Sequence, residues 1–226
     1  MPPPPTSERE KCGDPQTGGG GPWISSPEEE EMTQEPDDVL RSEHELIETL
    51  LFAVDGIAAR VGSEEPFPRE DVKKAMVVMV EFVDQCHHAK EERFLFPALS
   101  ENSPGKTKEL TRRVSSDRRA FRRLVAQMRT HLPTAEADRR ARRRLANELA
   151  LYSRLVHNHV RIEEERILPE ADRILGSAAR RRMTARFERL EADERDAGRH
   201  ARHQAMIREL AQAYATYVPG GINNPA

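Results

Sequence analysis

Two short segments of this chain repeat one arrangement of histidine, glutamate and proline. The segments are CHHAKEERFLFP (Cys86–Pro97) and HNHVRIEEERILP (His157–Pro169). In each of them a histidine is followed by glutamates four and five residues later, and by a proline ten residues later. Imidazole nitrogens and carboxylate oxygens are common ligands of transition-metal ions, so the repeat indicates metal coordination.

The spacing within each copy places the histidine and the first glutamate on the same side of a helix. Residues four apart lie about 6 Å from each other on a helix surface, so His87 pairs with Glu91 and His159 with Glu163. Each pair continues an apolar stripe of its own helix, formed by Met76, Val80 and Val83 and by Leu149, Tyr152 and Val156. Both pairs are therefore predicted to point inward. An ionised carboxylate in an apolar interior is costly unless a cation or a hydrogen-bonding partner compensates it.

A third histidine, His44, lies on the inward stripe of the first helix, between Leu40 and Ile47. His44 and His87 are about equally far along the chain from the connection near residue 65, so antiparallel helices bring them to the same height. A lone inward histidine is more often a hydrogen-bonded core residue than a ligand, and a lone H-x-x-x-E is common in charged helices. Because the pattern occurs twice and in register with apolar stripes, the sequence favours a bound metal.

The remaining histidines and nearby polar residues do not continue these stripes. We expect solvated positions, or positions around the ligands, for His88, His157, Glu92 and Glu164. We expect positions at helix ends or on the surface for His131, His200 and His203. Cys86 is predicted to be a partly buried, inert thiol.

The elements that carry these residues are predicted to be helices. Apolar residues recur at helical spacing, aromatic residues make up only 5% of the chain, and no segment alternates as a strand does. The expected helices run from a cap at Asp37 or Asp38 to about residue 61, then over about 69–97, 107–129 and 137–167. Short connections between four long helices predict an all-α, antiparallel, up-and-down four-helix bundle.

The two ends of the chain differ from this central region. Residues 1–36 are rich in proline, glycine and glutamate and are predicted to form a disordered tail. Residues 37–175 are expected to form the bundle. Residues 176–226 are expected to add a C-terminal extension of two helices that packs on the bundle.

Composition excludes several classes of function. The 36 basic and 39 acidic residues give a net charge of -3, and they are spread along the chain, which argues against a nucleic-acid partner. The longest apolar run, Ala75–Val80, is too short to cross a membrane. Two distant cysteines and the lack of a secretory signal predict a cytoplasmic protein.

These motifs resemble the hemerythrin-like, HHE cation-binding family. The matching segments are EHELIETLL around His44, the two repeats, and FERLEADERDAGRHARHQAMIRELAQAY towards the C-terminus. The resemblance implies a four-helix bundle with a non-haem di-iron centre. It implies that His44, His87 and His159 are imidazole ligands and that Glu91 and Glu163 are carboxylates able to bridge two irons. Manganese and zinc are alternative metals for such ligands.

One departure from this family concerns the third helix, where another histidine is expected. The equivalent position is Ser116, and no histidine lies between His88 and His131. Asp117 is the strong donor nearest to this position in helical phase. The centre is therefore predicted to be di-iron, asymmetric or mononuclear, with Asp117 as the candidate replacement.

Two classes of function remain. The favoured one is a protein that binds or senses oxygen, nitric oxide or peroxide, or that handles iron, rather than an enzyme. The alternative is a metal-free bundle that serves as an interaction scaffold. A ferritin-like oxidase is disfavoured because no histidine follows a glutamate by three residues, and the zinc protease motif H-E-x-x-H is missing. The sequence does not determine the oligomeric state.

Overall fold

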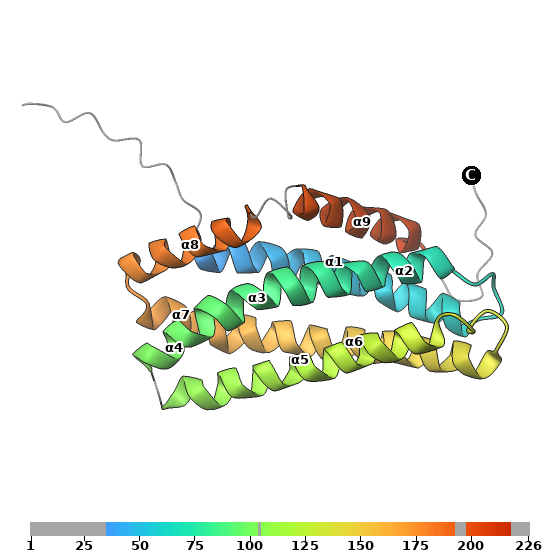
Figure 1. Ribbon diagram of the computed structural model, residues 1–226, viewed down its shortest axis with the longest axis horizontal. Coiled ribbons are helices and arrows are strands. Elements are labelled where there is room, and N and C mark those ends of the chain that lie inside the picture. The colour runs from blue at the N-terminus through green and yellow to red at the C-terminus, as the bar shows by residue number, and fades with distance from the viewer. Residues whose placement is uncertain (1–34, 104, 193–197, 218–226) are drawn as a thin grey trace, which may run out of the picture. The chain divides into compact units, whose positions relative to one another are not determined.

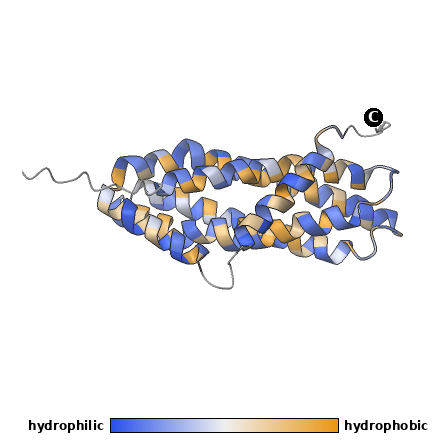
Figure 2. Ribbon diagram, turned by 90° about the horizontal axis from the view of Figure 1, so that it is seen from above, coloured by the Kyte–Doolittle hydropathy of each residue, from blue (hydrophilic) through white to orange (hydrophobic). Residues whose placement is uncertain are grey.

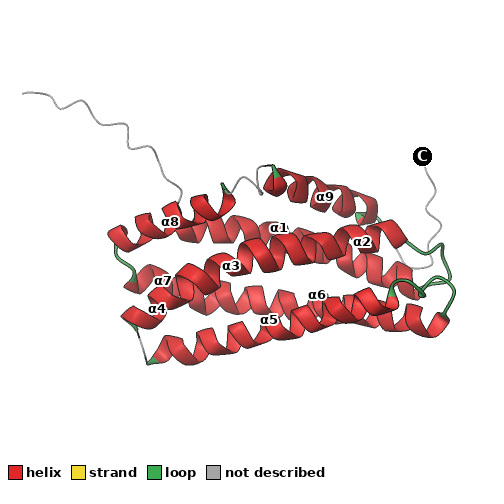
Figure 3. Ribbon diagram, in the orientation of Figure 1, coloured by secondary structure: helices red, strands yellow, loops and turns green. Residues whose placement is uncertain are grey.

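The computed structural model describes residues 35–103, 105–192 and 198–217, and these residues are almost entirely helical. No strand occurs within the described part of the chain (Figure 3). The all-α prediction is confirmed. The predicted disordered tail falls mainly on residues 1–34, which lie outside the described residues.

Four long helical rods form the centre of the structure. The first rod is α1 (Pro36–Gly62) and the third is α5 (Lys106–His131). The second rod is continuous through α2 (Arg69–Val78), a π-helical segment η1 (Met79–His87), α3 (His88–Lys90), a π-helical segment η2 (Glu91–Leu95) and α4 (Phe96–Asn102). The fourth rod is continuous through α6 (Arg139–Ile162), a π-helical segment η3 (Glu163–Ile167) and α7 (Leu168–Ile174).

Successive rods run in opposite directions and lie side by side (Figure 1). α1 packs along α6, α5 also packs along α6, and α4 packs against both α5 and α7. This arrangement is consistent with the predicted up-and-down four-helix bundle.

The repeated segments extend their helices further than the sequence predicts. We expected the second and fourth rods to end near Pro97 and at Ile167, but they continue to Asn102 and Ile174. A proline inside a helix lacks a backbone N–H and clashes with the carbonyl four residues earlier. In both rods a π-helical segment ends two residues before the proline, so the wider turn accommodates the proline and the helix continues.

The start of the first helix also differs from the prediction. Glu35, not Asp37 or Asp38, is the N-cap residue, and its side chain makes no capping hydrogen bond. Pro36 occupies the first turn, where a missing N–H costs nothing. Asp37 is buried and makes an ion pair with Arg180 of the C-terminal extension, with 3.3 Å between Oδ2 and Nη1.

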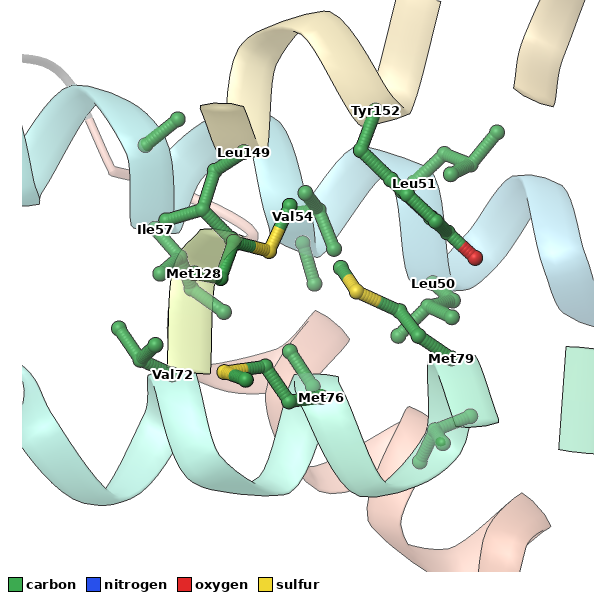
Figure 4. Packing of buried hydrophobic residues seen from close by; sticks show 14 of the residues in the cluster. Leu50, Leu51, Val54, Ile57, Val72, Met76, Met79, Met128, Leu149 and Tyr152 are labelled. Carbon is green, nitrogen blue, oxygen red and sulfur yellow. The ribbon is translucent and has the colours of Figure 1, made fainter. Parts of the chain in front are cut away.

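The core consists of two apolar clusters. Apolar residues recur along every helix between polar ones (Figure 2). In the larger cluster, side chains from all four rods meet, among them Leu50, Ile57, Met79, Met128 and Leu149 (Figure 4). The smaller cluster includes Leu40, Leu95, Val114 and Ile167.

A layer of buried polar side chains lies between these two clusters. Each rod contributes to this layer where its residues change from one cluster to the other. The contributors are His44 of α1, His87 and Glu91 of the second rod, Arg118 of α5, and His159 and Glu163 of the fourth rod. A buried charged layer is unfavourable unless its members compensate one another or bind a further ion.

Two further helices, α8 (Ser177–Glu191) and α9 (Arg199–Tyr214), follow the bundle and confirm the two helices predicted there. Both pack against α1, and α9 also packs against α2. The close approach of α9 requires a glycine at Gly56, because a Cβ there would lie 2.6 Å from Cδ1 of Tyr214. The predicted boundaries of the central and C-terminal regions, at residues 37, 175 and 176, stay a prediction.

None of the helices in the described ranges is long and apolar enough to cross a bilayer.

Candidate metal centre

Four of the five predicted ligands meet at one point. His44, His87, Glu91 and Glu163 each offer a ligand atom, and these atoms all lie within 4.8 Å of one another. The imidazole rings of His44 and His87 are 4.8 Å apart between centroids, which confirms that the first two rods bring them to one height. His87, Glu91 and Glu163 are fully buried, and His44 is 3% exposed.

The fifth predicted ligand, His159, lies next to this group. Its Nε2 is 3.0 Å from Oε1 of Glu163, and Nε2 of His44 is 3.4 Å from the other oxygen of Glu163. Glu163 therefore lies between two imidazoles. Neither contact has hydrogen-bond geometry, so both oxygens of Glu163 lack a hydrogen-bond partner.

Buried polar atoms without hydrogen bonds are concentrated at this point. They include Nε2 of His44, His87 and His159, Oε1 of Glu91, and both carboxylate oxygens of Glu163. A buried polar atom without a partner costs about 1–3 kcal/mol, and more when it is charged. Orphan nitrogens and oxygens converging on one point form a donor set that a metal ion satisfies.

The outer nitrogen of each ring faces a carboxylate. Nδ1 of His44 lies 2.6 Å from Glu164, and Nδ1 of His87 lies 3.0 Å from Glu43. A carboxylate only accepts hydrogen bonds, so Nδ1 donates in both cases and the lone pair of the neutral ring is left on Nε2. Histidines that bind metals are commonly held in this way, because the carboxylate fixes the tautomer and the ring orientation.

The position of Glu163 between the rings of His44 and His159 explains why the pKa values of these two histidines are strongly raised. Burial alone would lower the pKa of His44, but Glu163 and Glu164 raise it to about 10. Burial would likewise lower the pKa of His159, but Glu163 and Asp117 raise it to about 9. Glu163 thus draws positive charge towards itself, either protons on these rings or a metal ion.

Glu91 is compensated differently. Burial and the charge of Glu163 raise its pKa to about 8, and the charge of Arg118 opposes that shift. The Arg118 guanidinium, only 1% exposed, makes an ion pair with Oε2 of Glu91. A metal or protons on the neighbouring rings are therefore needed to neutralise Glu163, whereas Arg118 already neutralises part of the charge of Glu91.

The structure decides between the two positions predicted for His88 and corrects the prediction for His203. His88, predicted to be either solvated or in an outer position, is 2% exposed and forms a second group of candidate ligands with Glu91 and His159. His203 is 2% exposed and contacts Glu81 at 3.1 Å. The predicted outer positions of His157 and Glu164 agree with the structure, since the His157 side chain is 63% exposed and Glu164 contacts the ring of His44.

The third rod carries no replacement ligand at the position where the family has a histidine. Ser116 is exposed. Asp117 lies 3.6 Å from Nδ1 of His159, on the outer nitrogen of that ring and not on the nitrogen that faces Glu163. The position of Asp117 suits orientation of His159 rather than direct binding at the point where the other ligands meet.

Sequence analysis missed three buried charged residues: Glu43, Lys90 and Arg118. Lys90, fully buried, makes ion pairs with Glu43 and with Glu191 of α8. Burial would raise the pKa of Glu43, but the hydrogen bonds and charges of His87 and Lys90 lower it to about 2. A signal for two of these residues was available, because Lys90 follows His87 by one turn, and Arg118 lies between the inward residues Val114 and Phe121.

The fold and this donor set define an all-helical protein with a buried histidine–carboxylate centre suited to a metal ion. The sequence matches the hemerythrin HHE cation-binding domain over residues 35–171, which is more than half of the chain. The chain belongs to this family.

Its relatives include an uncharacterized protein of Mycobacterium bovis and uncharacterized proteins of two strains of Mycobacterium tuberculosis. Each is 26% identical to this chain over 177 residues, which cover 78% of this chain and 68% of the relative. No solved structure matches the chain.

Proposed function

We propose that this protein binds iron at the buried centre and uses it to bind or sense a small oxidant or diatomic molecule, or to handle iron, in the cytoplasm. The observation that supports it best is the convergence of unpartnered nitrogen and oxygen atoms from His44, His87, Glu91 and Glu163. Imidazole and carboxylate donors without thiolate suit iron, and manganese or zinc are the alternative occupants.

Iron bound by this donor set would supply a change of oxidation state and a coordination position for a small ligand. The chain's own residues hold the ligand atoms in place. Glu164 and Glu43 orient His44 and His87, while apolar residues of both core clusters keep bulk water away. These roles fit a protein that binds or senses a small ligand.

A pocket beside the centre supports a small ligand. It has a volume of about 130 Å³ and is lined mainly by apolar groups of the second, third and fourth rods, with His88 and Tyr152 among them. The ring of His88 lies 5.2 Å from that of His159 between centroids. A cavity volume of about 10–15 Å³ is enough to hold one water molecule, so the pocket has room for a diatomic molecule or peroxide.

Metal analysis of the full chain, loaded with ferrous iron without oxygen and freed of weakly bound metal, tests this function. We expect stoichiometric iron and, on addition of nitric oxide or oxygen, new absorption in the visible range. The same protein loaded with zinc is the control and should show no such absorption. A chain that retains no metal would favour the scaffold alternative.

A double variant tests which residues hold the metal. His87→Ala with Glu91→Ala should abolish binding. The matched control, His157→Ala with Glu165→Ala, removes the same kinds of side chain from exposed positions and should keep the full complement. Circular dichroism checks that both variants remain helical. If the first variant keeps its metal, the proposed site is wrong.

The scaffold alternative has one observation in its favour. Arg118 already compensates Glu91, and protons on His44 and His159 can compensate Glu163. The orphan Nε2 of His87 has no role in a metal-free bundle, because burial lowers the pKa of that ring to about 4 and Nε2 keeps an unused lone pair.

A further inference from the structure

Arg118 is the contribution of the third rod to the buried polar layer. It lies between Val114 and Phe121 on the inward side of α5, between the two apolar clusters. The other three rods place histidines at this level. The third rod places a guanidinium there.

Several contacts fix the guanidinium of Arg118. Nη2 makes an ion pair with Glu91, and Nη1 donates to the carbonyl oxygen of His88 at 2.9 Å and lies 3.0 Å from Glu92. The guanidinium also lies over the ring of Phe96, at 5.0 Å from the centroid. These contacts hold a planar, positively charged group beside Glu91.

Two of the groups of candidate ligands share Glu91 and differ in the number of donors that they offer. The first group has four donors, His44, His87, Glu91 and Glu163. The second has three, His88, Glu91 and His159. Arg118 holds Oε2 of Glu91, while Oε1 lacks a hydrogen bond and lies 3.6 Å from Nε2 of His87, on the side of the first group.

Charge distinguishes the two groups further. Glu91 and Glu163 contribute two buried negative charges, and Arg118 contributes one buried positive charge. One divalent ion leaves this layer with one excess positive charge, whereas two divalent ions leave it with three. The half-buried carboxylates of Glu92 and Glu164 offset part of this charge. The guanidinium of Arg118 nevertheless places a positive charge directly beside any ion that would bind Oε2 of Glu91, and like charges at such short range repel each other.

We propose that the chain binds one metal ion, in the group of His44, His87, Glu91 and Glu163, and that Arg118 takes the place of a second ion. Arg118 is then a positioning residue that holds Glu91 as a ligand of one metal instead of a bridge between two. This proposal rests on the proposed metal-binding function and names the number of ions and the residue that sets it.

The metal content and spectrum of the full wild-type chain test the proposal directly. After loading with excess ferrous iron, removal of weakly bound metal and oxidation, we expect one iron per chain and the paramagnetic resonance of an isolated high-spin ferric ion. Two irons per chain with a magnetically coupled, silent spectrum would overturn the single-ion proposal and leave the metal-binding function intact. No retained metal would instead contradict the metal-binding function itself.

Substitution of Arg118 tests its role. Arg118→Met removes the charge at similar length and frees Oε2 of Glu91, so Mn(II) titration of this variant should rise from one ion per chain to two. Arg119→Met is the matched control, because Arg119 is the next residue of α5 and is exposed, and it should stay at one ion. A helical Arg118→Met chain that still binds one ion would show that Arg118 does not exclude the second.

Arg118→Lys covers the case in which Arg118→Met does not fold. Lysine keeps the positive charge but loses the planar set of donors. We expect this variant to stay at one ion per chain. Two ions bound by Arg118→Lys would contradict the charge argument.

Discussion

The two copies of the repeated segment adopt the same local structure but have different surroundings. In each copy the first glutamate begins a π-helical segment and is fully buried, and the helix continues past the proline. Glu91 has a fixed cation, Arg118, on one oxygen, whereas Glu163 lies between the rings of His44 and His159. A permanent charge compensates one carboxylate, while exchangeable protons or a metal must compensate the other.

The second glutamates of the two copies also have different partners. Glu92 lies 3.0 Å from Arg118, whereas Glu164 contacts His44 and makes an ion pair with Arg41. A short repeat thus supplies equivalent ligand atoms twice, and its neighbours give the copies different roles. The copy around Glu163 is the one expected to depend on metal.

The largest expected effect is the loss of metal binding when Glu163 is replaced. Glu163→Gln removes the charge that draws a cation to His44 and His159, so the metal affinity should fall by more than the roughly 10–100-fold typical of residues that support ligands. Competition with a coloured chelator measures this change. Glu165→Gln, in the same helix turn but exposed, is the control and should leave the affinity unchanged.

In the metal-free protein, replacing Glu91 should reduce the free energy of unfolding more than replacing Glu163, which is the reverse of the order expected for metal binding. Glu91→Gln removes the buried charged partner of Arg118 and leaves only the partly exposed Glu92 beside it, which should cost about 3–5 kcal/mol of unfolding free energy. Glu163→Gln should cost much less, because His44 and His159 can release their protons. Urea unfolding in the presence of a chelator measures both. Equal losses in the two variants would contradict this comparison.

The pH dependence of metal binding should arise from the Glu163 copy. The pKa values of His44 and His159 are raised to about 10 and about 9, so both rings carry protons at neutral pH when no metal is bound. A metal must displace these protons, and the affinity should therefore rise with pH up to this range. We expect about a tenfold change per pH unit for each proton displaced.

Proton release into a weakly buffered solution during zinc titration measures this exchange. His157→Ala is the control, because that ring is exposed and contacts Glu48 instead of a candidate ligand, and the release should be unchanged. An affinity independent of pH between neutrality and pH 9 would show that the two rings are not protonated.

The smallest expected effect concerns the carboxylate that orients His44. Glu164→Gln keeps an oxygen acceptor near Nδ1 but loses its negative charge, so the metal affinity should fall by about tenfold, the lower end of the usual range. The Glu165→Gln chain serves again as the reference. A change as large as that of Glu163→Gln would indicate that Glu164 binds the metal directly.

Much of the fold and of the candidate site could be predicted from sequence, because both depend on helical periodicity. Apolar stripes at helical spacing predict the rods, and the continuation of those stripes predicts that His44, His87, Glu91, His159 and Glu163 face the interior. The helix ends near Pro97 and Ile167 were predicted wrongly, since a proline signals a break but a π-helical turn absorbs it.

Only the tertiary structure decided which charges compensate one another. The partners lie far apart along the chain: Arg118 and Glu91 are separated by 27 residues, and His44 and Glu164 by 120. Periodicity indicates that a side chain points inward, but it does not indicate which inward side chain of another helix it meets. The sequence alone therefore determined the fold class, the family resemblance and the inward ligand residues. The packing of the four rods decided that Glu91 pairs with Arg118 and that Glu163 lies between His44 and His159.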